Sequence, residues 1–89
     1  MTGFWGMDIP AVRALATQLM TKADEIEAIA NALTTQLNAA QWLGPDADAF
    51  RSDWQGAHRA QLFAVGNALR DASSHATANA NQQEQAGTT

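Results

Sequence analysis

Two long stretches of this chain carry apolar residues every three or four positions, and one short break separates them. The first stretch runs from Asp8 to Asn38 without a glycine, and its only proline is Pro10. Proline is tolerated in the first turn of a helix, and an aspartate just before that turn is a favourable N-cap. This pattern predicts a helix over residues 8–39.

The apolar positions of this first helix follow the alternating steps of a heptad repeat. Leu15, Met20 and Ile29 widen the stripe, which indicates a helix with two neighbours rather than one. The stripe itself consists of Val12, Ala16, Leu19, Ala23, Ile26, Ala30, Leu33 and Leu37.

The break is predicted to be a turn at residues 40–45, followed by a second helix over residues 45–80. Gly44 can take the positive φ that a sharp reversal needs, and Pro45 suits the first position of a helix. Asp46 and Asp48 follow, where carboxylates interact favourably with the positive end of a helix. Because the connection is short, the two helices should be antiparallel neighbours.

The apolar line of the second helix is less regular, and the polar residues 81–89 after it are expected to form a flexible tail. Leu62 and Leu69 flank this line. Its members are Ala47, Phe50, Trp54, Ala57, Gln61, Val65, Ala68, Ala72 and Ala76. Residues 1–89 thus form a single hairpin domain.

A lone hairpin of this kind would leave half of each stripe in water. Each exposed Leu or Ile forgoes roughly 1.5–3 kcal/mol of burial. The chain has 89 residues and no cysteine, so disulfides and thiolate metal sites cannot stabilise it. We therefore expect an all-α fold, an antiparallel two-helix hairpin that dimerises into a four-helix bundle. The expected hairpin and dimer seam includes Val12, Leu19, Ile26, Leu33, Leu37, Phe50, Trp54 and Val65.

Charge and hydropathy exclude several classes of partner. The net charge is −4 and the few basic residues are scattered, which argues against nucleic-acid binding and against a basic membrane-surface helix. No apolar run approaches the ~20 residues needed to span a bilayer, so stable membrane insertion is not expected. The first residues also lack the pattern of a secretory signal peptide.

The sequence offers no catalytic, cofactor or metal site. His58 and His75 lie seventeen positions apart on one predicted helix, roughly 25 Å along its axis, and cannot share a metal. Ser73 and Ser74 adjoin His75, but adjacent helical positions point in different directions. The aspartates after Pro45 lack the glycine and the glutamate of a calcium loop. We expect a protein that is not an enzyme.

Two groups of aromatic residues leave alternatives open. Trp42 either plugs the hairpin end against Phe50 and Ala47, or forms a partly exposed recognition knob with Leu43. Phe4 and Trp5 either fold back onto the start of the first helix, or form an exposed patch.

The order helix, Trp42-Leu43-Gly44, helix, in an acidic chain of this length without cysteine, resembles the WxG family of small type VII secretion proteins. Pro45, Phe50 and Trp54 also resemble the stretch after the motif in actinobacterial members of these early-secreted-antigen-like hairpins. The resemblance covers nearly the whole chain in length, layout and motif position. It implies homodimeric or heterodimeric four-helix bundles that a membrane ATPase-driven machine exports folded, without a signal peptide.

The resemblance also implies a bipartite export signal, in which the WxG turn of one subunit lies near a C-terminal Tyr-x-x-x-Asp/Glu motif of the other. Trp42 and Gly44 match the first half. Glu84 fits the acidic position of the second half, but Ala80 stands where the tyrosine belongs, and the chain contains no tyrosine. Either a partner supplies the missing half, or this chain is an adaptor or is not exported through that signal.

These observations predict a dimeric, non-enzymatic substrate or co-secreted partner of a type VII (ESX-like) system. Its expected partners are itself or a second WxG-type protein and the secretion machinery, and its expected location is outside the cell after a cytoplasmic stage. The alternative is a cytoplasmic adaptor or chaperone that pairs with the helical targeting domain of a larger effector or toxin. Membrane lysis fits poorly, since the stripes are rich in alanine and the polar faces lack the basic residues that bind anionic lipid.

Overall fold

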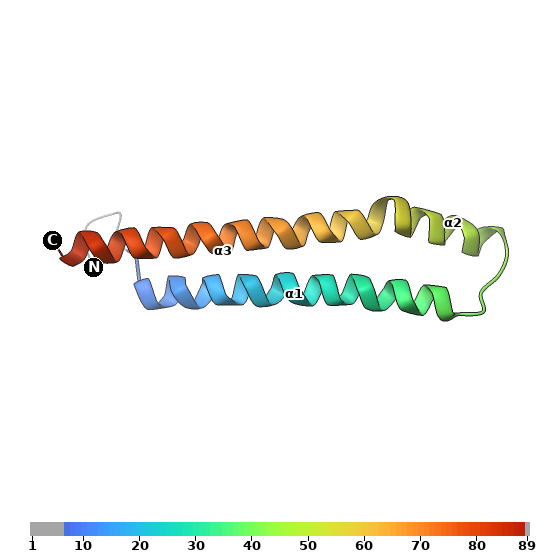
Figure 1. Ribbon diagram of the computed structural model, residues 1–89, viewed down its shortest axis with the longest axis horizontal. Helices are drawn as coiled ribbons and strands as arrows, with labels where there is room; N and C mark the ends of the chain where they lie inside the picture. The colour runs from blue at the N-terminus through green and yellow to red at the C-terminus, as the bar shows by residue number, and fades with distance from the viewer. Residues whose placement is uncertain (1–6, 89) are drawn as a thin grey trace.

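The computed structural model describes residues 7–88, which form one helical hairpin (Figure 1). Helix α1 (Ile9–Ala39) runs antiparallel to a second rod made of α2 (Pro45–Asp53), a π-helical turn (Trp54–His58) and α3 (Arg59–Thr88). The molecule measures 66 × 17 × 15 Å along its principal axes. The predicted all-α hairpin is therefore confirmed for a single chain.

The helix boundaries follow the capping residues of the sequence. Asp8 is the N-cap of α1, and its side chain accepts a hydrogen bond from the Ala11 amide at 3.1 Å. Gly44 precedes α2 with φ 116° and ψ 177°. This backbone region is accessible essentially to glycine alone. Pro45 then starts α2, as predicted.

Small residues form the contact between the two rods. In α1 the buried seam positions are Ala16, Ala23 and Ala30, seven residues apart. The Ser73 hydroxyl donates a hydrogen bond to the Ala16 carbonyl at 2.7 Å, so the backbones are close there. The facing buried positions on the second rod are Ala47, Trp54, Gly66, Ser73 and Ala80.

Gly66 lies close to the backbone of α1 near the middle of the hairpin. A Cβ atom at this position would lie 3.6 Å from the Ala23 carbonyl oxygen and 3.3 Å from Oε2 of Glu27. A larger side chain at position 66 would therefore push the two rods apart.

The seam on the second rod changes phase at the π-helical turn. Trp54 and Gly66 are both buried but twelve residues apart, whereas three turns of α-helix hold about eleven. The wider turn, closed by a hydrogen bond from the Arg59 amide to the Trp54 carbonyl, accommodates the extra residue. The predicted line through Ala57, Gln61 and Val65 ignored this shift and was wrong for the contact between the rods, since these residues are exposed.

Residues 81–88 continue α3 as a helix, so the prediction of a flexible tail was wrong for this segment. Cross-helix contacts hold it: Ala80 is buried, and the guanidinium of Arg13 donates to Asn81 at 2.8 Å and to Glu84 at 2.9 Å. Phe4 and Trp5 lie outside the described residues.

Candidate functional site

The WxG turn connects the rods at one end of the hairpin, where α1 stops and α2 begins (Figure 1). The Ala40 amide donates to the Gln36 carbonyl at 3.0 Å and closes α1. The Asp48 amide donates to the Gly44 carbonyl at 3.0 Å and opens α2. No atom lies within 4 Å of where a Gly44 Cβ would be, so it is the backbone conformation and not space that requires glycine there.

Trp42 and Leu43 are exposed on this turn. Trp42 retains 44% of its accessible surface and Leu43 retains 87%. The Trp42 ring lies beside Phe50, with ring centroids 6.1 Å apart and planes tilted by 47°. Phe50 is itself exposed. The turn therefore presents a small apolar surface, which we call the turn knob: Trp42, Leu43 and Phe50.

The tryptophan that is buried near this end of the hairpin is Trp54, not Trp42. Trp54 is buried in the seam, and its indole N–H donates to Oγ1 of Thr34 at 2.8 Å. The Thr34 hydroxyl in turn donates to the Ala30 carbonyl of α1 at 2.9 Å. The predicted contact between Trp42 and Phe50 is present, but it lies at the surface.

Arg51 ties the turn to the end of α1. Its Nε and Nη2 donate to the Leu37 carbonyl at 3.0 and 2.9 Å, and Nη2 also donates to the Ala40 carbonyl at 3.1 Å. Its Nη1 donates to the Trp42 carbonyl at 2.7 Å, and the guanidinium carbon lies 5.9 Å from the Trp42 ring centroid. The charge also faces the negative end of the α1 dipole. Sequence reasoning grouped Arg51 with the scattered basic residues and missed this role.

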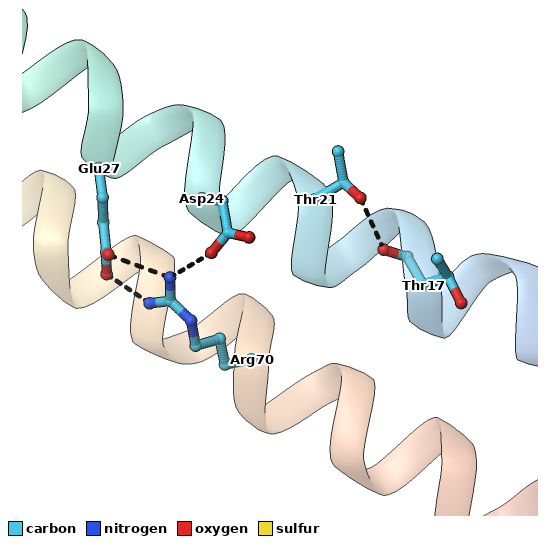
Figure 2. A network of polar contacts seen from close by, with 5 residues as sticks. All are labelled: Thr17, Thr21, Asp24, Glu27 and Arg70. Carbon is cyan, nitrogen blue, oxygen red and sulfur yellow. Dashed lines mark hydrogen bonds and ion pairs between the residues drawn. The ribbon is translucent and has the colours of Figure 1, made fainter.

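One flank of the hairpin is closed by polar contacts between the rods (Figure 2). Arg70 of α3 lies between two carboxylates of α1, with Nη2 at 2.7 Å from Asp24 and both terminal nitrogens bonded to Glu27. Glu27 and Arg70 each lie four positions after a seam residue, on the same side of the antiparallel pair. We call this side the ion-pair flank: Arg13, Glu27, Arg70 and Glu84.

These contacts shift the pKa values of Glu27, Arg70 and Glu84. Hydrogen bonds from Arg70 lower the pKa of Glu27 and raise that of Arg70 itself. A hydrogen bond from Arg13 lowers the pKa of Glu84. Glu84, the residue that fits the acidic position of the expected C-terminal signal, is therefore held as a carboxylate against α1.

The opposite flank carries exposed apolar side chains. Leu15 and Ile29 lie one position before a seam residue of α1, and Val65 lies one position before Gly66. Their exposures are 50%, 60% and 47%. We call this side the apolar flank; together with the half-buried residues between it and the seam it comprises Val12, Leu15, Leu19, Ile26, Ile29, Leu33, Leu62, Val65 and Leu69.

The expected seam residues therefore divide into three groups. Trp54 is buried within the chain, and Phe50 and Val65 are exposed. The α1 members are half-buried at the edge of the small-residue seam: Val12, Leu19, Ile26, Leu33 and Leu37.

The other candidate residues do not form a site in the described part of the chain. His58 and His75 are exposed, and no group of three or more acidic or histidine side chains converges among residues 7–88. The same residues enclose no pocket. None of the described helices is both long and apolar enough to cross a membrane.

Comparison with protein-family models, curated proteins and solved structures gave no match to this chain. The turn knob, the ion-pair flank and the apolar flank are the surface features that bear on function.

Proposed function

We propose that this protein is a non-enzymatic component of a type VII secretion system, exported as a substrate or with a partner and recognised through its WxG turn. The observation that carries the proposal is the exposure of Trp42 and Leu43 at the hairpin end. Trp54 is the tryptophan that packs between the rods near that end, whereas Trp42 is left 44% exposed. An exposed tryptophan offers a large contact area with few rotatable bonds and is favoured at binding hot spots.

The backbone of the turn supports the same proposal. Gly44 adopts φ 116°, and Arg51 of α2 donates to carbonyls of the last turn of α1 and of the connection. The direction in which Trp42 projects is therefore set before any partner binds. Such preorganisation lowers the entropic cost of recognition.

The test is export of Trp42→Ala in cells that carry the secretion machinery, with Met20→Ala as the control. Met20 is also an exposed apolar residue, but it lies far from the turn. We expect Trp42→Ala to accumulate inside the cell while remaining helical, and Met20→Ala to be exported normally. Normal export of Trp42→Ala would contradict the proposal.

The proposal includes pairing of two hairpins into a four-helix bundle through the apolar flank. Leu15, Ile29 and Val65 remain about half exposed in the single chain, and covering the exposed half of each would gain roughly 0.7–1.5 kcal/mol. The ion-pair flank is less suited to this role, because Arg70 and Arg13 already bond across it.

Solution mass tests the pairing, with the same substitution made on each flank. Ile29→Lys places a charge on the apolar flank, and Met20→Lys places one beside the ion pairs. Lysine is a good helix former, so neither change should melt α1. We expect a dimer for the native chain and for Met20→Lys, and a monomer for Ile29→Lys. A dimeric Ile29→Lys would exclude the apolar flank as the interface.

The second candidate is a cytoplasmic adaptor or chaperone that pairs with the helical targeting domain of a larger effector. The absence of tyrosine favours it, since the chain then lacks one half of the expected export signal. Under this alternative, the apolar flank is covered by the effector's helices. A native chain that is monomeric alone and gains thermal stability only with such a domain would support the adaptor over the homodimer.

A further inference from the structure

We infer that Arg51 is a positioning residue for Trp42, holding both its backbone and its ring in the exposed arrangement of the turn knob. The inference rests on the proposed recognition of this turn. A single guanidinium contacts the carbonyls of Leu37, Ala40 and Trp42, which span the last turn of α1 and the middle of the connection. Arg51, which lies in α2, thus ties the end of α1 and the connection to the second rod.

The carbonyls that Arg51 binds lack a partner within the helix because α1 stops at Ala39. In a longer helix, the Leu37 carbonyl would accept from the amide of residue 41, but α1 stops at Ala39. Arg51 supplies two donors to that oxygen instead. Removing the guanidinium would leave the last turn of α1 and the connection without this tie.

Trp42 depends on Arg51 more directly than its neighbours do. Backbone hydrogen bonds hold the two ends of the connection, at Ala40 and at Gly44. Between them, the Trp42 carbonyl is held by Nη1 of Arg51 at 2.7 Å. The centroid of the Trp42 ring lies 5.9 Å from the guanidinium carbon of Arg51 and 6.1 Å from the centroid of the Phe50 ring. Loss of Arg51 would therefore release the backbone of Trp42 and remove a contact of its ring.

Lysine cannot replace arginine in this role. The planar guanidinium carries five N–H donors in a fixed fork, which lets one side chain reach three carbonyls and present a face to an aromatic ring. An ammonium is a compact point charge on a flexible stem. The geometry therefore predicts that Arg51→Lys keeps the charge near the end of α1 and still loosens Trp42.

The experiment records backbone and indole ¹H–¹⁵N spectra of Arg51→Met and Arg51→Lys, with Arg59→Lys as the control. Arg59 also makes a cross-rod bond, to Asn31 at 3.2 Å, and lies over the Phe63 ring at 4.6 Å, but it does not contact the turn. The Trp42 indole is assigned with Trp42→Phe. We expect a reduced heteronuclear NOE and a shifted resonance for the Trp42 indole in both Arg51 variants, with the Trp54 indole unchanged. Arg59→Lys should alter neither indole.

Export of the same variants separates this inference from the proposed function. A mobile Trp42 together with lost export supports both. A mobile Trp42 with normal export, alongside normal export of Trp42→Ala, supports the positioning role and overturns recognition through the turn. An unchanged Trp42 indole in both Arg51 variants overturns the positioning role, whatever export shows. Loss of helicity in both variants would show that Arg51 holds the hairpin as a whole, and would also overturn it.

Discussion

Trp42 and Trp54 lie close to the same turn, but one is exposed and the other is buried between the rods. Trp54 is 5% exposed, occupies a seam position and donates its N–H to Thr34 of the other rod. Trp42 is 44% exposed, and its ring lies beside Phe50 and Arg51 in the turn region. The comparison teaches that the hairpin end is stabilised by one aromatic residue, which leaves the other free for recognition.

The largest effect is expected for Trp54→Ala. Truncating a buried tryptophan removes its burial and leaves a cavity, at a cost of about 3–5 kcal/mol. The free energy of unfolding, measured by denaturant titration at fixed protein concentration, should fall by that amount. An unchanged midpoint would mean that Trp54 does not seal the hairpin.

A smaller loss is expected for Trp54→Phe. Phenylalanine keeps most of the packing but removes the donor to Thr34, which should lower the free energy of unfolding by about 1 kcal/mol. In the Trp54→Phe variant the Thr34 hydroxyl has lost its donor. Adding Thr34→Val removes this hydroxyl, so the double variant should recover part of the lost free energy of unfolding. A double variant whose loss equals the sum of the single losses would show that the hydrogen bond contributes nothing.

Trp42→Ala should affect stability least among these changes at the aromatic residues. The ring is nearly half in water and its contacts lie at the surface, so we expect a loss below about 1 kcal/mol. Thermal unfolding followed by circular dichroism measures it. A loss as large as that of Trp54→Ala would reverse the assignment of the two roles.

A change of pH perturbs the contact between the rods without altering either tryptophan. The pKa of Glu27 is lowered in the folded chain, so its stabilising contribution is present above the ordinary glutamate pKa of about 4.3 and is lost as pH falls through the lower, folded value. The melting temperature should therefore drop between pH 6 and pH 3, and drop less in Glu27→Gln.

Glu25→Gln is the matched control for this experiment, since Glu25 bonds Lys22 within α1 and does not join the two rods. It should keep the native pH dependence, whereas equal pH profiles for the native chain and Glu27→Gln would show that the ionised form of Glu27 contributes nothing. The Trp54 indole should keep its resonance as long as the chain stays folded.

Local rules were enough to predict the helices and the turn. Asp8 as the cap of α1, the positive φ of Gly44 and the start of α2 at Pro45 each depend on the chemistry of one or two residues, and each is confirmed. Long-range contacts were harder to predict. The π-helical turn shifts the seam by one residue. The continuous apolar line drawn from the sequence therefore placed Val65 in the seam, whereas Val65 is exposed.

The site was only partly predictable for the same reason. Trp42 and Leu43 stand out by residue type, but their exposure depends on Trp54 occupying the seam. Arg51 acts on carbonyls up to fourteen positions away, which composition cannot reveal. A sharper signal was available in the small residues Gly66, Ser73 and Ala80, whose seven-residue spacing marks the seam of α3.

The elongated shape of the hairpin makes the mode of pairing visible in solution scattering. A single chain has a radius of gyration of 19.6 Å, which is set mostly by its 66 Å length and hardly by its narrow cross-section. Two hairpins joined along the apolar flank would double the forward scattering while barely enlarging that radius. Hairpins joined end to end through the turn knob would raise both. One small-angle X-ray scattering curve therefore distinguishes lateral pairing from pairing through the turn.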